Sequence, residues 1–209
     1  MRLADARKDR YRILAKEIGY RSRSAFKLIE LNERYNLFRN SNTIIDIGCS
    51  PGGWLQVASK YSKSNTRIIG VDINPTEPLD NITILRRNIE DPKLAEVLLE
   101  IARSPFDLLL SDLSPNVSGI WDYDHARQVS ISIYALDLAS KILRIGGDAV
   151  FKIFEGEMMN DFKDKLADIF TKVIVCKPKA SRQESSELYI ICKNVQDSNE
   201  TLRKNVNGR

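Results

Sequence analysis

Hydrophobic residues follow two different periods along this chain. From Thr43 onward, short runs of β-branched and other apolar residues alternate with longer stretches whose apolar positions recur every three or four residues. The short runs predict buried strands at 43–47, 67–72, 82–85, 107–111, 148–153, 172–176 and 187–193. The longer stretches predict helices at 53–62, 92–103, 124–144 and 157–170. This alternation predicts an α/β fold, a single doubly wound Rossmann-like domain with a seven-stranded, mostly parallel sheet.

Proline and glycine sharpen two of these helix ends. Pro92 suits the first turn of the helix at 92–103, because proline lacks the N–H group that a first turn leaves unpaired. Gly146 and Gly147 suit the end of the long helix, because glycine readily adopts the left-handed conformation found there. We therefore expect the long helix to close at this glycine pair, with the next strand following directly.

Two further helices precede the first strand. Residues 5–18 and 24–36 carry apolar residues at helical spacing. They predict a basic helical N-terminal extension over residues 1–39, which is followed by the main domain at 40–193. Residues 194–209 are polar and show no periodicity, which predicts a disordered tail.

The composition narrows the class of protein. The chain has 209 residues, 43% hydrophobic and 29% charged, which is typical of soluble globular proteins and leaves room for one compact domain. It has no apolar run of the ~20 residues that a membrane helix needs, and its first residues form no apolar leader. We therefore expect a cytoplasmic protein with no membrane partner.

Cysteine and histidine are scarce. Cys49, Cys176 and Cys192 lie far apart, so they predict neither a disulfide framework nor a Cys-x-x-Cys metal site. His125 is the single histidine, so a histidine-ligated metal centre or a Ser-His-Asp triad would depend on one residue. We expect chemistry without a metal, in a monomeric protein.

The positive charge is concentrated near the N-terminus. The net charge is +4, but residues 1–39 hold 11 Lys or Arg against 5 Asp or Glu, whereas the rest of the chain holds 21 against 23. A basic segment on a nearly neutral domain suits a phosphate backbone or an acidic membrane surface. A solvated helical face is the alternative interpretation.

A glycine-rich turn follows the first predicted strand. The segment Gly48-Cys49-Ser50-Pro51-Gly52-Gly53 leads into a helix, and its glycines let the main chain approach a ligand beyond the strand ends. The second strand ends in Asp72, 24 residues after Gly48, where a carboxylate can accept hydrogen bonds from two ribose hydroxyls. The spacing fits a dinucleotide or S-adenosylmethionine. The turn favours the latter, since it lacks both the G-x-G-x-x-G pattern and a P-loop lysine.

Charged residues at strand ends form a second candidate cluster. Asp112 follows the apolar strand at 107–111 and precedes a proline turn. Lys152 interrupts the apolar run of strand 148–153, where an ammonium group is costly unless it is paired. Glu187 opens the last strand. Any one of them could be a solvated or turn-capping residue, but three at strand ends favour a functional site.

These motifs together resemble one protein family. They are Phe26-Lys27-Leu28, Asp46-x-Gly48-x-x-Pro51-Gly52-Gly53-Trp54, Asp72, Ser111-Asp112-x-x-Pro115-Asn116, Phe151-Lys152 and Ser186-Glu187-x-Tyr189. Their order and joint presence resemble the FtsJ/RrmJ-like family of S-adenosylmethionine-dependent RNA 2′-O-ribose methyltransferases, over roughly Tyr20 to Cys192. Within the family the chain looks closest to the group E enzymes, which methylate a uridine ribose in large-subunit (23S-type) ribosomal RNA.

The resemblance implies two sets of site residues. The catalytic set is a Lys-Asp-Lys-Glu tetrad at Lys27, Asp112, Lys152 and Glu187, with Lys152 at its centre. The set that binds S-adenosylmethionine comprises Gly48, Gly52, Trp54, Asp72, Asn88 and Asp112. Asn88 departs from the family pattern, in which an aspartate often lies near the adenine, although an amide oxygen can still accept a hydrogen bond. The implied partner is ribosomal RNA or the large ribosomal subunit.

These residue types suit the implied chemistry. Methyl transfer to a ribose hydroxyl is an in-line displacement, so much of the catalysis is positioning. A buried lysine can accept the proton of the 2′-hydroxyl or orient its lone pair, a role that we assign to Lys152 with Lys27 beside it. Asp112 and Glu187 would hold both lysines and balance their charge.

The resemblance also gives the remaining motifs a possible use. The basic residues expected on an RNA phosphate track are Arg2, Arg7, Lys8, Arg10, Arg12, Arg21, Arg23 and Lys27, with Tyr11 and Tyr20 available for stacking. Trp121 and Tyr123 follow the Asp112 turn and either pack under a loop or line the pocket of the target nucleotide.

Three other functions remain open on the sequence. A transfer RNA ribose methyltransferase shares the turn and the tetrad. A non-catalytic ribosome assembly factor could retain the cofactor fold, but it would not need four intact tetrad residues. A dinucleotide oxidoreductase is opposed by the pattern of the glycine-rich turn.

Overall fold

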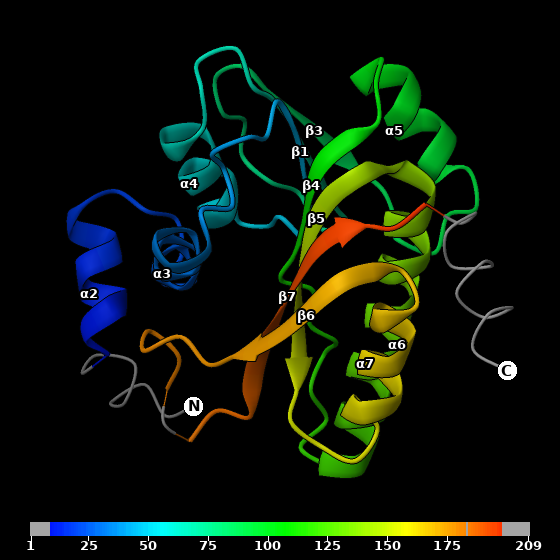
Figure 1. Cartoon of the computed structure of the whole chain (residues 1–209). Coiled ribbons are helices and arrows are strands. Elements are labelled where there is room, and N and C mark those ends of the chain that lie inside the picture. Colours follow the sequence, from blue (N-terminus) through cyan, green and yellow to red (C-terminus); the bar gives the residue numbers. More distant parts are fainter. Residues whose placement is uncertain (1–8, 183, 198–209) are drawn as a thin grey trace, which may run out of the picture.

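The computed structural model describes residues 9–182 and 184–197, which form one sheet covered by helices on both faces (Figure 1). The strands are β1 (Thr43–Ile47), β2 (Arg67–Asp72), β3 (Ile82–Arg86), β4 (Phe106–Ser111), β5 (Leu143–Phe154), β6 (Phe170–Cys176) and β7 (Glu187–Val195). The helices are α2 (Arg10–Glu17), α3 (Ala25–Tyr35), α4 (Gly53–Tyr61), α5 (Leu94–Ala102), α6 (Trp121–Ile142) and α7 (Met159–Ala167).

The sheet has the order β3-β2-β1-β4-β5-β7-β6. The five strands from β3 to β5 pair in parallel, and β7 is antiparallel to both β5 and β6. The predicted seven-stranded, mostly parallel α/β fold is therefore confirmed. Because β7 runs against its neighbours, its first residues lie at the edge where β1, β2, β4 and β5 end.

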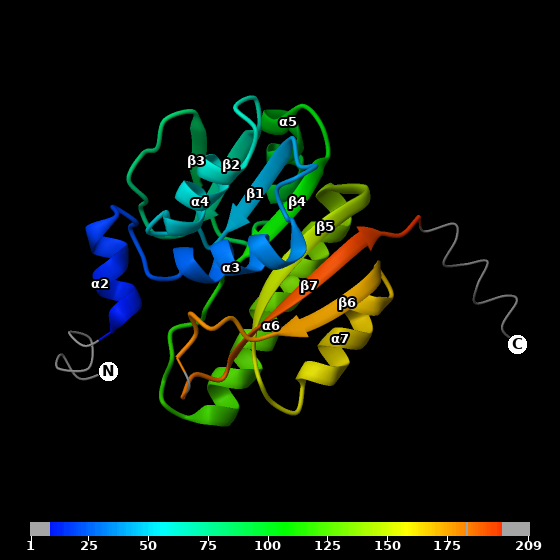
Figure 2. The same cartoon turned by 60° about the vertical axis from the view of Figure 1, so that its left-hand side comes forward.

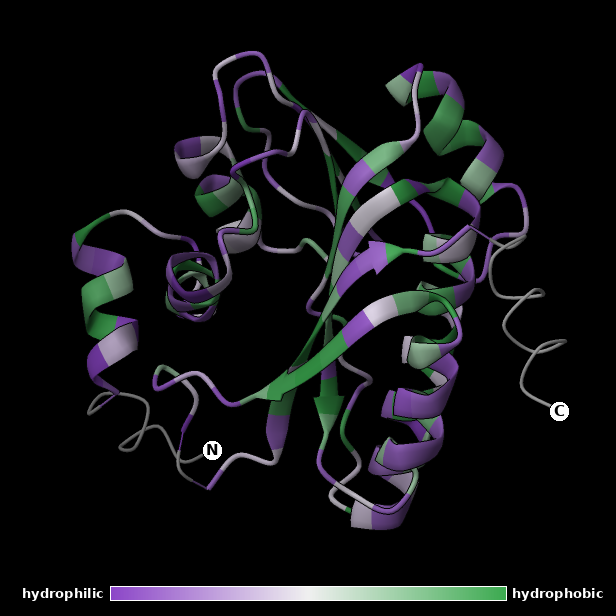
Figure 3. Cartoon of the chain, in the orientation of Figure 1, coloured by the Kyte–Doolittle hydropathy of each residue, from purple (hydrophilic) through white to green (hydrophobic). Residues whose placement is uncertain are grey.

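Two layers of helices bury the two faces of the sheet. In Figures 1 and 2, α3 and α4 cover one face with α2 outside them, and α5, α6 and α7 cover the other. The alternation along β1 shows why both faces are apolar, since Ile45 and Ile47 join one core cluster and Ile44 joins the other. Figure 3 shows hydrophobic residues along much of the sheet and mostly hydrophilic residues along α6 and α7.

The long helix ends earlier than its glycine pair predicted. Helix α6 spans Trp121–Ile142 and passes directly into β5, so Gly146 and Gly147 lie inside a strand and close no helix. Gly146 has a φ of 77°, and the pairing register between β4 and β5 shifts between Phe106 and Leu108. The two glycines thus belong to an irregular strand segment, where glycine is also favoured.

Other element ends differ by a few residues from the prediction. Helix α5 begins at Leu94, so Pro92 lies in the turn before the helix and not in its first turn. Strand β7 extends to Val195, two residues into the stretch predicted to be a tail, and residues 198–209 lie outside the described part. Residues 5–8 of the first predicted helix are likewise outside it. Within the described ranges, no helix is long and apolar enough to span a bilayer.

Ion pairs dock the N-terminal segment on the domain. Asp9 caps α2 by accepting the backbone N–H of Arg12 at 3.2 Å, and its carboxylate also pairs with Arg23 and, at 2.8 Å, with Arg182. Arg23 in turn donates to the carbonyl of Ala180 at 2.6 Å. Residues separated by more than 150 positions are therefore joined beside the start of β7.

Candidate active site

The charged residues predicted from strand ends meet at one edge of the sheet. Asp112 follows β4, Lys152 lies near the end of β5, and Glu187 begins the antiparallel β7. Lys152 is directly opposite Tyr189 in the pairing of β5 with β7, and Glu187 is opposite Phe154. The topology of the sheet thus brings together residues that are up to 75 positions apart in the chain.

Lys27, Asp112, Lys152 and Glu187 form a continuous charged cluster. Lys27 Nζ lies 2.6 Å from Glu187 Oε2, and Lys152 Nζ lies 4.0 Å from the other oxygen of the same carboxylate. Lys152 Nζ also donates to the backbone carbonyl of Asp112 at 2.8 Å and lies 3.4 Å from Asp112 Oδ1. Two ammonium groups and two carboxylates therefore balance in charge at one place.

The lysines of this cluster are buried, and the carboxylates are more open. The side chains of Lys27 and Lys152 are 8% and 5% exposed, against 18% for Asp112 and 26% for Glu187. Burial alone would raise the pKa of Glu187, but the positive charges of Lys27 and Lys152 and the hydrogen bond from Lys27 lower it below its usual value. Glu187 is thus held ionised between the lysines.

Tyr189 is a member of the site that the prediction missed. Its hydroxyl donates to Asp112 Oδ1 at 2.7 Å and accepts a hydrogen bond from Lys27 Nζ at 3.3 Å. Burial, followed by the nearby carboxylates of Asp112 and Glu187, raises the pKa of Tyr189 well above its usual value, so the hydroxyl keeps its proton. The spacing Glu187-x-Tyr189 was the available signal, since alternate residues of a strand share one face.

Helix α6 fixes the backbone that carries Lys152. The Gln128 side-chain amide and the Ser132 hydroxyl both donate to the carbonyl of Lys152, at 3.0 and 3.3 Å. The Gln128 and Ser132 side chains are both buried, so their hydrogen bonds to the Lys152 carbonyl are shielded from solvent. The lysine is therefore positioned by the helix behind it as well as by its ionic partners.

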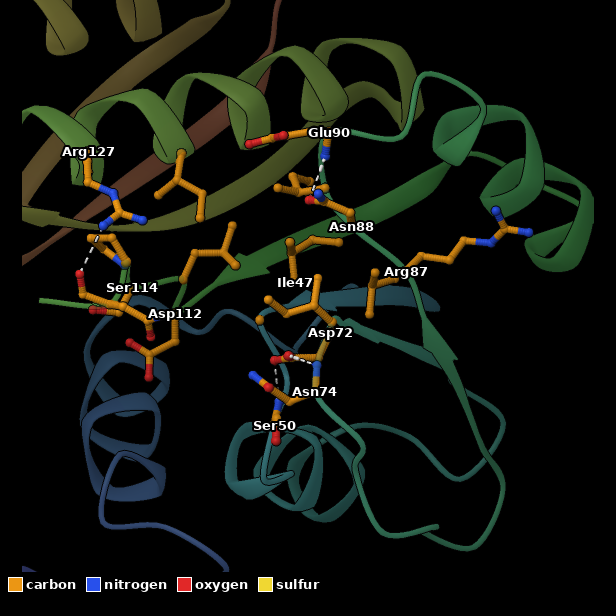
Figure 4. A pocket seen from close by; sticks show the side chains of 18 of the residues that line it. Ile47, Ser50, Asp72, Asn74, Arg87, Asn88, Glu90, Asp112, Ser114 and Arg127 are labelled. Atoms are coloured by element: carbon orange, nitrogen blue, oxygen red, sulfur yellow. Dashed lines mark hydrogen bonds between the residues drawn. The ribbon is translucent and has the colours of Figure 1, made fainter.

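A cavity of about 390 Å³ adjoins the charged cluster at the same edge (Figure 4). It is lined by the ends of β1, β2 and β4, by the turn after β3 and by one side of α6. Gly48, Asp72, Asn88 and Asp112, all predicted to bind the cofactor, lie in its wall. This size lies within the range of small-molecule sites, and the location beyond parallel strand ends is typical of them.

The carboxylate of Asp72 shapes one end of this cavity. It accepts the backbone N–H of Ser50 at 2.9 Å and that of Asn74 at 2.7 Å (Figure 4). Gly48 adopts a φ of 78°, and a Cβ atom there would lie 2.8 Å from the Leu113 side chain. A glycine is therefore required for the turn to pass this close to the end of β4.

Asn88 uses its amide oxygen within its own turn. The oxygen accepts the backbone N–H of Glu90 at 3.1 Å, so the neighbouring NH₂ group is the donor at this side of the cavity (Figure 4). We expected the amide oxygen to serve a ligand, and this hydrogen bond gives it a local partner. The contact of Asn88 with a cofactor stays a prediction.

Gly52 and Trp54 do not line the cavity. Gly52 caps α4 with a φ of 110° and packs against Arg21. The Trp54 side chain points into the core, where its indole N–H donates to the carbonyl of Ser24 at 2.9 Å and its ring lies 5.7 Å from that of Tyr189. The side chain of Trp54 is thus positioned to support Tyr189, and a cofactor contact from either residue stays a prediction.

Asp46 is a second residue that the prediction left out of the site. It is fully buried on β1, and neither carboxylate oxygen has a hydrogen-bond partner among the described residues. Burial, and after it the negative charges of Asp112 and Asp72, raises its pKa well above the usual value. The buried carboxyl beneath the site therefore holds its proton more tightly than an exposed aspartate does. The described residues contain no group of three or more His, Cys, Asp or Glu that could hold a metal ion.

Comparisons with known proteins give a consistent result. A family model for the FtsJ-like methyltransferases matches residues 20–195. The chain is 44% identical over 193 residues to a ribosomal RNA large subunit methyltransferase E of Cenarchaeum symbiosum. The match covers 92% of this chain and 97% of that protein. The corresponding protein of Nitrosopumilus maritimus is 42% identical, with 92% and 98% of the two chains covered.

A solved structure is also similar. It is a crystal structure of a protein from Plasmodium falciparum that has been assigned as a ribosomal RNA methyltransferase. The TM-score is 0.76 at 30% sequence identity, and the match covers 84% of this chain and 98% of that one. The similarity therefore extends over most of the fold.

Proposed function

Because the chain belongs to the FtsJ-like methyltransferase family, we propose that it methylates the 2′-hydroxyl of a uridine ribose in large-subunit ribosomal RNA, with S-adenosylmethionine as the methyl donor. The names of the two relatives support a large-subunit ribosomal RNA substrate, since each is similar to this chain over more than nine-tenths of its length. The charged cluster supports a hydroxyl group as the acceptor, and the uridine comes from the family resemblance of the sequence motifs.

The observation that carries the proposal is the position of Asp112. Asp112 lines the cavity. Its backbone carbonyl and its carboxylate contact Lys152, and the carboxylate also accepts a hydrogen bond from Tyr189. A ligand in the cavity would therefore lie next to buried ammonium groups. This arrangement suits a transfer reaction in which one bound molecule supplies a group and a lysine holds the acceptor.

The residues of the cavity fit S-adenosylmethionine. Each carboxylate oxygen of Asp72 accepts one backbone N–H, from Ser50 or from Asn74. Each oxygen has a further lone pair that can accept a hydrogen bond from a ribose hydroxyl. Ile89 and Leu113 supply apolar surface suited to an adenine, and Gly48 gives the main chain a close approach. When bound, S-adenosylmethionine supplies a methyl group on a sulfonium sulfur.

The charged cluster supplies what the acceptor hydroxyl needs. As an ammonium group, Lys152 would orient the 2′-oxygen, and as a neutral amine it would accept the hydroxyl proton. In either case the bond from the oxygen to the methyl carbon would replace the methyl–sulfur bond of the donor. Lys27, paired with Glu187, adds positive charge beside it, and Asp112 holds Lys152 from the cavity side. Positioning by these contacts is the main contribution that we assign to the protein.

The experiment measures transfer of labelled methyl from S-adenosylmethionine to large ribosomal subunits, naked ribosomal RNA and transfer RNA. Alkaline hydrolysis then tests the position, because a 2′-O-methyl group protects the adjacent phosphodiester bond and leaves labelled dinucleotides. We expect such dinucleotides from ribosomal material and their loss in Lys152→Ala. Lys172→Ala is the matched control, since Lys172 is an exposed lysine on β6.

Each other result would contradict a part of the proposal. Label confined to transfer RNA would replace the substrate with that RNA class. Label released by alkali as mononucleotides would place the methyl group on a base. Binding of S-adenosylmethionine without label in any RNA would favour an assembly factor that retains the cofactor fold.

A further inference from the structure

An exposed apolar patch lies beside the charged cluster and has no role in the site described above. Its members share high exposure at the start of α6 and in the segments next to it. They are Val117 (66% exposed), Ile120 (66%), Trp121 (47%), Tyr123 (54%) and Met158 (42%). Large exposed apolar groups in one place commonly mark a binding surface. We call these five residues the mouth patch.

Trp121 connects the mouth patch to the charged cluster. Its ring stacks on Phe154 with the ring centres 6.1 Å apart and 26° between the planes. Phe154 lies two residues after Lys152 on β5, on the same face of the strand, and is paired with Glu187 on β7. The exposed indole is therefore separated from the reactive edge by one aromatic ring.

The indole is held rigidly from below. It also stacks on His125, with the ring centres 6.0 Å apart and 14° between the planes, and His125 Nε2 accepts the backbone N–H of Met158 at 3.2 Å. Asp124 fixes the preceding loop by accepting from Ser118 N at 2.7 Å and Gly119 N at 3.0 Å. A planar group with a fixed orientation and an open surface suits stacking, because little entropy is lost on binding.

Charge differs across the mouth of the site. The first turn of α6 and the turn after β5 lie on one side of the end of β5, and α2 and the β6–β7 connection lie on the other (Figure 1). The side with α2 carries the exposed cations Arg10, Arg12, Lys179 and Arg182. The mouth patch is flanked by the exposed carboxylates Asp122, Glu155 and Glu157, with the exposed cation Arg127 on its Tyr123 side. Phosphates are favoured on the first side and disfavoured on the second.

We infer that Trp121 forms a stacking platform for an unpaired base of the RNA substrate, at or next to the nucleotide whose ribose meets Lys152. The phosphates then follow the cationic side, and a base points to the aromatic side. Tyr123 is two positions along the helix and faces another direction, with Arg127 over its ring at 5.4 Å from the centre, so it is not part of the platform. The inference rests on the proposed RNA substrate and adds the part of the RNA that the mouth patch recognises.

Tryptophan fluorescence tests the platform directly. The chain has two tryptophans, of which Trp54 is 2% exposed and Trp121 is 47% exposed, so an added ligand has access to Trp121. The probes are hexauridylate and a ribose-phosphate hexamer without bases. We expect hexauridylate to quench the emission and the abasic hexamer to leave it unchanged, and the quenching to disappear in Trp121→Phe.

Methyl-transfer kinetics test the role in catalysis. Stacking of one base raises affinity by about 5- to 150-fold, so Trp121→Ala should raise the KM for RNA by a factor in this range. The affinity for S-adenosylmethionine, measured by equilibrium dialysis, should not change. Tyr134→Ala is the matched control, because Tyr134 is 43% exposed on the same helix and lies outside the mouth patch.

The possible failures can be told apart. Equal quenching by the abasic hexamer, or an unchanged KM for RNA in Trp121→Ala while the wild-type protein methylates RNA, would overturn the platform and leave the proposed function intact. If the wild-type protein methylates no RNA, the proposed function fails. The base-dependent quenching then decides separately whether the platform binds RNA. A thermal unfolding curve that matches the wild type confirms that each variant is folded.

Discussion

One hydroxyl group joins the two lysines of the charged cluster. Tyr189 accepts from Lys27 and donates to the same Asp112 oxygen that faces Lys152, while Glu187 contacts both lysines from the other side. The five side chains thus form a closed ring of hydrogen bonds and ion pairs. In such a ring, loss of one polar atom leaves two charged partners less well fixed.

We therefore predict that Tyr189→Phe lowers kcat by roughly tenfold, which corresponds to about 1.4 kcal/mol of lost positioning in the transition state. The change removes only the hydroxyl, so the free energy of unfolding should fall by about 1 kcal/mol. KM for S-adenosylmethionine should stay constant, because the hydroxyl lies among the charged cluster. Tyr61→Phe, at a tyrosine that is 39% exposed, is the control in the same methyl-transfer assay. A fall in stability with unchanged kcat would reduce Tyr189 to a structural role.

Asp46 makes the stability of the domain depend on pH. Its raised pKa means that the folded protein holds the proton more tightly than the unfolded chain, whose carboxyl has a pKa of about 3.9. The contribution of protonated Asp46 to the free energy of unfolding is therefore complete below the pKa of the unfolded chain. It is lost as the pH rises toward the pKa of the folded protein. Between the two values, the loss is about 1.4 kcal/mol per pH unit.

Asp46→Asn should remove this dependence, since an amide does not titrate. We predict that the free energy of unfolding of the variant, relative to the wild type, increases as the pH rises above the unfolded value of about 3.9 and stops increasing at the folded value. Urea unfolding at several pH values measures it. Asp137→Asn, at a carboxylate that is 58% exposed on α6, should follow the wild-type curve. Parallel curves for Asp46→Asn and wild type would show that Asp46 is ionised in the folded protein.

At the scale of elements, the sequence predicted the strands and helices well because their signals are local. A strand buried on both sides must be apolar throughout, as β1 and β4 nearly are, and the register then brings Asp112 and Lys152 to one edge. The Lys-Asp-Lys-Glu set itself came from the family resemblance, and the structure brings its four members into contact.

The features that were missed depend on partners far away in the chain. The glycine pair at 146–147 has the same local signal in a helix end as in an irregular strand, and only the pairing with β4 decides between them. Tyr189 and Trp54 could not be separated by type, because both are aromatic residues beside a motif. In the structure the Trp54 side chain is buried and bonds to a backbone carbonyl. The Tyr189 hydroxyl instead bonds to Asp112 and Lys27.

For the whole molecule, the main asymmetry is in charge. The basic N-terminal segment is docked by Asp9 on Arg23 and Arg182, which places α2 beside the start of β7. Burial would raise the pKa of Asp9, but hydrogen bonds from Arg182 and Arg12, together with the arginine charges, lower it. Helix α2 is therefore attached at the same edge as the charged cluster, whereas α7 covers the opposite face of the sheet (Figure 1).

This placement predicts that charge on α2 matters more for RNA binding than equal charge elsewhere. Replacing Arg10, Arg12 and Lys16 by alanine should weaken RNA binding and make the slope of log K against log salt less negative by about 2, because each lost phosphate contact with single-stranded RNA contributes about 0.7. Alanine favours helix, so α2 should remain folded.

The matched control replaces the exposed Lys141, Lys165 and Lys172, which changes the net charge equally on other elements. If both triple variants flatten the slope to the same extent, RNA responds to net charge alone and α2 is not part of its path. A flattened slope only in the α2 variant, with unchanged affinity for S-adenosylmethionine, would assign the phosphate track to this edge.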